Sequence, residues 1–206
     1  MTTRMTRLLQ HRWREARLKR DSLSAAVLAR LAARVRQSEQ SHSGEIRLFV
    51  EAGLPLSYLW RPAPLGQIIR ERAVTQFGKL RVWDTAHNNG VLIYLLLAER
   101  RIEVVADRGL SAQVAPEVWQ AMVKRMGTAF KQGAFEAGLA LAVDEISALL
   151  VQHFALAPGE ANPNELPDHP TWAEPGLPLP PNQPPLGGSR LTSSGGTYAA
   201  QRFARP

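Results

Sequence analysis

Six polar residues in the middle of the sequence have the side-chain types best suited to chemistry. They are Glu45, Asp84, Asn88, Asn89, Asp107 and Arg108. Carboxylate and amide oxygens are the ligands that hard divalent cations such as Ca²⁺ and Mg²⁺ prefer. A neighbouring arginine could hold an anion through its guanidinium group. They can act together only if the secondary structure around them brings their side chains close in space.

A predicted β-hairpin connects most of them. The turn signal at residues 87–90 is followed by seven apolar residues, 91–97, a pattern typical of a strand buried on both faces. A charged break then leads to a partly alternating strand at residues 102–106. The short connection implies antiparallel pairing, because a parallel return needs a dozen or more residues. The two outer ends of the hairpin therefore meet, which places residues 84–89 beside Asp107 and Arg108.

Glu45 is predicted to lie at the same edge. Residues 46–50 alternate in the manner of a strand, and residues 65–78 show helical spacing before the hairpin begins. Such crossover connections are right-handed in nearly all cases and join parallel strands. The starts of both strands then lie at one edge, so Glu45 and His42 approach His87 and the asparagines.

Two interpretations of this edge remain open. The cluster could bind Ca²⁺ or Mg²⁺ through Glu45, Asp84, Asn88, Asn89 and Asp107, with Arg108 as an anion-binding residue. The same residue types also satisfy loop amides locally, so the set could be turn capping alone. Open parallel sheets usually bind ligands at the carboxyl ends of their strands, here beyond Val50 and Leu97, and that rule favours capping.

The remaining pattern defines the fold class and the domain organisation. A leading helix after residue 21 and two closing helices within residues 111–154 complete the order (α)-β-α-β-β-α-α. This order predicts a three-layer α/β/α sandwich around a small mixed sheet. We expect a basic amphipathic arm at residues 1–20, the α/β domain at residues 21–155, and a disordered tail rich in Pro, Gly and Ser at residues 156–206. Eleven of the 15 prolines lie after residue 154.

Composition and charge narrow the function classes. The net charge is +7, but residues 1–20 carry seven of the 25 basic residues and one of the 18 acidic residues. The remainder is nearly neutral, so we expect no specific nucleic-acid partner, although the arm could touch an anionic membrane. The sequence has no cysteine, no run of 18 apolar residues and no secretory signal pattern. We therefore expect a cytoplasmic protein without a transmembrane helix.

The hairpin also carries a family resemblance. NNGVLIYLLLAERRIEVVADRGL at residues 88–110 and SHSGEIRLFVEA at residues 41–52 resemble the TPM domain family, and the resemblance spans about residues 5–155. GEIRLFVEAGLP and VWDTAHNNGVLIYLLLA resemble its soluble bacterial branch. The resemblance implies calcium binding, as in some members, and acid phosphatase activity, as claimed for the plant member. Residues 107–109 read Asp-Arg-Gly where many secreted members have a glycine-rich turn.

Three functional hypotheses follow. The first is a non-enzymatic binding or accessory module with an unidentified protein partner, linked to membrane or envelope protein maintenance. The second is a metal-dependent phosphatase acting on phosphomonoesters, in which a cation, Arg108 and either Asp84 or Asp107 would neutralise phosphate charge. The third is a peripheral protein held on an anionic membrane surface by the basic arm.

Overall fold

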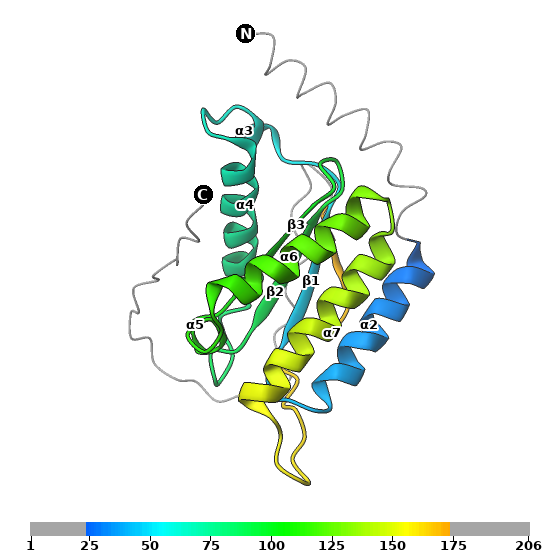
Figure 1. Ribbon diagram of the computed structural model, residues 1–206, viewed down its shortest axis with the longest axis vertical. Coiled ribbons are helices and arrows are strands. Elements are labelled where there is room, and N and C mark those ends of the chain that lie inside the picture. Colours follow the sequence, from blue (N-terminus) through cyan, green and yellow to red (C-terminus); the bar gives the residue numbers. More distant parts are fainter. Residues whose placement is uncertain (1–23, 174–206) are drawn as a thin grey trace.

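The computed structural model describes residues 24–173, which form ten helices and strands (Figure 1). The order is α2 (Ala25–Glu39), β1 (Ile46–Glu51), α3 (Leu56–Leu59), α4 (Leu65–Lys79), β2 (Val91–Leu96), β3 (Arg101–Ala106), α5 (Arg108–Ser111), α6 (Pro116–Lys131), α7 (Phe135–Phe154) and β4 (Thr171–Ala173). The predicted arm at residues 1–20 lies outside the described residues.

The four strands form one mixed sheet in the order β3-β2-β1-β4. Strand β1 pairs in parallel with β2, in the register Ile46 with Val91, and β2 pairs with β3 as an antiparallel hairpin. Helix α4 forms the crossover between β1 and β2. The predicted crossover, hairpin and strand directions are confirmed.

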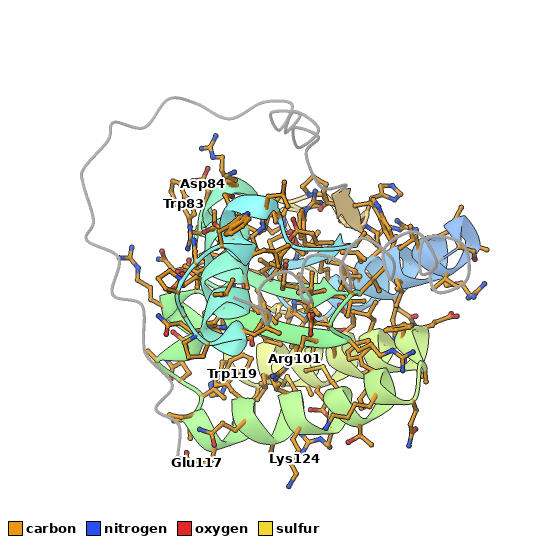
Figure 2. All side chains as sticks on the ribbon, turned by 90° about the horizontal axis from the view of Figure 1, so that it is seen from above. Trp83, Asp84, Arg101, Glu117, Trp119 and Lys124 are labelled. Atoms are coloured by element: carbon orange, nitrogen blue, oxygen red, sulfur yellow. The ribbon has the colours of Figure 1, made fainter. Side chains whose placement is uncertain are left out.

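Helices cover both faces of the sheet and make the predicted three-layer sandwich. Helices α2, α6 and α7 lie on one face, and α4 lies on the other (Figures 1 and 2). Strand β2 is buried at every position, so alternate side chains enter the two cores. Ile93 and Leu95 join the core beneath α6 and α7, while Leu92 and Tyr94 join the core beneath α4.

Exposed ion pairs link the three helices of the first face. Arg30 and Arg34 on α2 bind Glu136 and Asp144 on α7, with Nε–carboxylate distances of 2.6 Å in each pair. Arg125 on α6 binds Glu145 on α7 in the same way, with an Nε–carboxylate distance of 2.7 Å. Within residues 24–173, α7 is the one helix that is long and apolar enough to cross a membrane, by length and composition alone. Its buried face packs against the sheet between α2 and α6.

The structure corrects the predicted boundary of the C-terminal tail. The chain after α7 forms a loop that contacts the approach to β1 through Asn162, Glu165 and Leu166, and Thr171–Ala173 form β4, which pairs in parallel with β1. Leu166 packs into the core beneath α4, and Trp172 packs against the opposite core. The expectation of a disordered tail from residue 156 is therefore wrong for residues 156–173. Residues 174–206 lie outside the described residues.

Candidate functional site

Backbone hydrogen bonds connect the residues at the amino ends of β1 and β2. The backbone N–H of Val91 donates to Glu45 O at 2.8 Å, and the N–H of Asp107 donates to Gly90 O at 2.9 Å. Glu45, Gly90 and Asp107 are therefore neighbours along one edge. A Cβ on Gly90 would lie 1.9 Å from the Val82 carbonyl oxygen, so the close approach requires glycine.

The turn before β2 uses its polar residues for local hydrogen bonds. Asn88 has φ of 52°, the left-handed conformation that the turn signal predicts. Its backbone carbonyl accepts from Gly109 N at 2.8 Å, and its Oδ1 accepts from Arg108 Nε at 3.2 Å. The N–H of Asn89 donates to Thr85 Oγ1 at 3.1 Å. Asn88 and Arg108 therefore connect the turn to the end of the hairpin, whereas Asn89 stabilises the turn itself.

The three carboxylates point to different partners. The Glu45 carboxylate accepts from the backbone N–H groups of Glu165 and Leu166, at 3.0 and 3.1 Å. Asp107 Oδ1 accepts from the N–H of Arg108 at 2.7 Å and caps α5. The exposed Asp84 pairs with Arg81 and lies beside α4 (Figure 2). Within residues 24–173, no three His, Cys, Asp or Glu side chains are grouped so that they could hold a metal ion.

The two histidines of this edge differ in exposure. His42 is completely buried, and its Nδ1 donates to Gly44 O at 3.0 Å. Burial lowers the pKa of His42, so the ring is neutral at physiological pH. His87 is exposed in the turn. His42 therefore stabilises the chain just before β1 through its hydrogen bond to Gly44.

Three buried polar atoms of this edge have no hydrogen-bond partner in the described structure. They are His42 Nε2, Asn89 Oδ1 and Asp107 Oδ2. Burial also raises the pKa of the Asp107 carboxyl group above its usual value. Buried polar atoms are normally satisfied by protein, water or an ion, so Asn89 Oδ1 and Asp107 Oδ2 are the oxygens that suit a small ligand best.

A second polar cluster holds residues 162–171 against β1. Asn162 Nδ2 donates to His42 O at 2.8 Å, and Glu45 receives the two backbone N–H groups described above. Arg47 donates to the Pro167 carbonyl and to Thr171 Oγ1. Because these donors and acceptors come from three positions along β1 and its approach, the segment is fixed along its length.

Burial shifts the titration of the acidic residues in this cluster. It raises the pKa of Glu39 to about 8, although that side chain accepts from Ile46 N at 3.0 Å. It also raises the pKa of Glu45 to about 7 against the opposing effect of its two N–H donors. Both groups therefore take up protons when the chain folds near pH 6.

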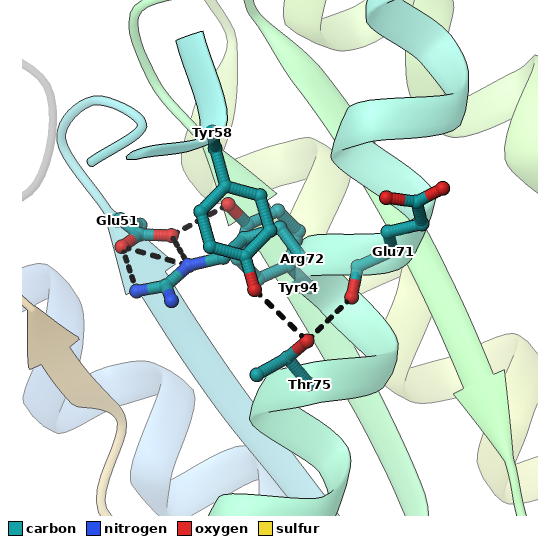
Figure 3. Close-up of polar contacts among 6 residues, drawn as sticks. All are labelled: Glu51, Tyr58, Glu71, Arg72, Thr75 and Tyr94. Atoms are coloured by element: carbon teal, nitrogen blue, oxygen red, sulfur yellow. Dashed lines mark hydrogen bonds and ion pairs between the residues drawn. The ribbon is translucent and has the colours of Figure 1, made fainter. Parts of the chain in front are cut away.

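A third polar network lies toward the carboxyl end of β1, beneath α3 and α4 (Figure 3). Arg72 Nε donates to Glu51 Oε2 at 2.9 Å, and Tyr94 OH donates to the same oxygen at 2.7 Å. Burial and the adjacent carboxylate raise the pKa of Tyr94 well above its usual value, so its hydroxyl group stays protonated. Tyr58 lies over Arg72, with its ring centroid 5.1 Å from the guanidinium carbon, and its hydroxyl group donates to Thr75 Oγ1 at 3.0 Å.

This third network was not among the predictions made from the sequence. Its signal was the alternation within IRLFVE, which places Arg47, Phe49 and Glu51 on one face of β1. Two opposite charges on one face of a fully buried strand require partners elsewhere. The partners, Arg72 and the segment around Pro167, come from distant parts of the chain, so spacing alone could not identify them.

Comparisons with known proteins agree with this architecture. A family model of the TPM domain matches residues 19–149. The fold is similar to the NMR structure of the BA42 protein from the psychrophilic bacterium Bizionia argentinensis, with a TM-score of 0.61 and 24% sequence identity. That likeness covers 75% of this chain and 97% of the other. No match to this chain was found among curated proteins.

The hairpin motif, the β1 motif and the helices that follow them all lie within the matched residues. The match includes more than half of the 206 residues. The chain belongs to the TPM domain family.

Proposed function

We propose that this TPM-domain chain is a non-enzymatic binding module, acting in the cytoplasm as an accessory protein in membrane or envelope protein maintenance. The observation that carries the proposal is an exposed apolar surface formed by Leu56 of α3 and by Trp60, which caps the end of α3. Leu56 and Trp60 are 60% and 56% exposed, the largest fractions among the large hydrophobic side chains of residues 24–173. Adjacent exposed apolar side chains can provide a contact surface for a partner.

The charged side chains within the domain support the same proposal. Glu45 and Glu51 are buried and engaged by backbone N–H groups or by Arg72 and Tyr94. Such contacts position strands and segments, and none of them leaves a carboxylate directed toward solvent. The carboxylates of Glu45 and Glu51 therefore serve the fold, whereas the apolar side chains of Leu56 and Trp60 remain available to a partner.

Cross-linking in cells tests this proposal. A photoreactive amino acid at position 60 should form a cross-link to one cellular component, and the same group at position 151 should not. Val151 is a matched control because it is 40% exposed and lies at the opposite end of the molecule, near the end of α7. Equal labelling from the two positions would contradict a binding role for α3.

A second candidate function is the metal-dependent phosphatase, which Asn89 Oδ1 and Asp107 Oδ2 favour as unpartnered buried oxygens. A Ca²⁺ or Mg²⁺ ion held there would neutralise phosphate charge, and Arg108, at the same turn, would hold the anion. Titration of the protein with either ion, followed by two-dimensional NMR, should then move the amide signals of residues 88–90. Asp107→Asn should remove those shifts while leaving the fold intact, and the absence of shifts in the parent protein would exclude this candidate.

A further inference from the structure

Helix α3 presents its apolar residues from a rigid base. Leu56 and Trp60 are four residues apart, so they lie on the same side of this single turn. Tyr58 and Leu59 face inward and belong to the core beneath α4. Arg61 lies over the Tyr58 ring, 4.0 Å from its centroid. The exposed side chains are therefore held outward by a buried anchor.

Basic side chains gather at the same end of the sheet. The N–H of Ala98 donates to Ala52 O at 3.0 Å, which places the β2–β3 turn beside the start of the α3 loop. Arg100 and Arg101 are exposed in and after this turn. Arg100 also donates to the carbonyl of Lys131, the last residue of α6, at 3.1 Å. Figure 1 shows α3, this turn and the end of α6 at one end of the molecule.

The start of helix α2, which follows the most basic part of the sequence, also lies at this end of the molecule. Helix α2 begins at Ala25 beside the start of α7, at the same end of the molecule as the β2–β3 turn (Figure 1). The preceding residues 1–20 contain seven basic residues and one acidic residue. The exposed basic residues of the β2–β3 turn therefore lie at the end that carries Leu56 and Trp60, and the sequence that precedes α2 is rich in basic residues.

We propose that this end of the molecule docks on an anionic membrane surface, an inference that rests on the binding role proposed above. Trp60 and Leu56 enter the headgroup region, where an indole ring is favoured because it is amphipathic. Arg100 and Arg101 face the lipid phosphates from the adjacent turn. An apolar turn flanked by basic residues binds such surfaces through buried area and charge together.

Vesicle sedimentation with the full chain tests the inference. The parent protein should bind vesicles of phosphatidylcholine and phosphatidylglycerol, and bind poorly to phosphatidylcholine alone. Leu56→Ser combined with Trp60→Ser should weaken binding roughly tenfold, since the apolar contact is lost. Arg101→Glu should weaken vesicle binding by at least about fivefold, since basic charge near the membrane surface is removed. The binding that remains should depend less steeply on salt concentration than that of the parent. Val151→Ser should bind like the parent.

Each contrary outcome has a distinct meaning. Equal vesicle binding by the parent and the Leu56→Ser/Trp60→Ser variant would overturn the inference, as would failure of the parent to bind anionic vesicles. If the position-60 cross-link still forms to a protein in either case, the binding role stands and the membrane is not the partner. Matching thermal midpoints for the variants and the parent would exclude unfolding as the cause of lost binding.

Discussion

Leu166 offers a direct test of the boundary that the structure sets for the domain. Its side chain is 8% exposed and packs into the core beneath α4, while its backbone N–H donates to Glu45. Leu166→Ala removes the packing and keeps the backbone hydrogen bond. Large-to-small changes in cores cost about 2–5 kcal/mol, and a site at the margin of a core belongs at the lower end, about 2–3 kcal/mol.

For a domain of this size that loss lowers the thermal midpoint by roughly 5–10 °C. Circular dichroism during heating measures it, with urea unfolding as an independent estimate of the free energy. Pro158→Ala, at an exposed position of the same segment, is the matched control and should change stability by less than about 0.5 kcal/mol. Melting of Leu166→Ala within 1–2 °C of the parent, about the error of the assay, would refute the packing of residues 156–173.

Three further predictions concern burial and charge. The pKa values of Glu39 and Glu45 are raised to about 8 and about 7 in the folded state, so the folded chain binds more protons than the unfolded chain above pH 4.5. The free energy of unfolding should therefore fall as pH rises from 5 to 8, by up to about 1.4 kcal/mol for each unit by which a pKa is raised, and Glu39→Gln should flatten this slope. Leu95→Asp should prevent folding, because an unpaired buried charge costs several kcal/mol against a stability of roughly 5–15, and a soluble, cooperatively melting variant would contradict the layer assignment. Arg34→Ala should cost less than about 1 kcal/mol in urea unfolding, because Arg34 and Asp144 are both about half exposed.

The sequence predicted the sheet edge well because local patterns determine it. Seven apolar residues after an Asn-Gly turn have few alternatives to a buried strand, and the short return at residues 98–101 forces a hairpin. The crossover helix then fixes the parallel direction of β1. Glu45 and Asp107 reached the same edge for these reasons alone.

The contacts that were missed depend on residues far apart in the chain. Asp84 pairs with Arg81, whose φ of 55° belongs to a left-handed turn that its residue type does not signal. The prolines of residues 156–173 suggested disorder. The segment is instead held by hydrogen bonds to Glu45 and Arg47, two residues more than 100 positions earlier in the chain. Composition describes the segment itself and carries no information about those partners.

The distinction between a binding module and a phosphatase can be measured directly in a turnover assay with p-nitrophenyl phosphate and millimolar Ca²⁺ or Mg²⁺. The binding role predicts that phosphate release by the parent protein equals that of Asp107→Asn in either ion, because Asp107 then serves only as the N-cap of α5. Release by the parent that depends on the ion and is lost in Asp107→Asn would contradict the proposed function and establish a metal-dependent phosphatase.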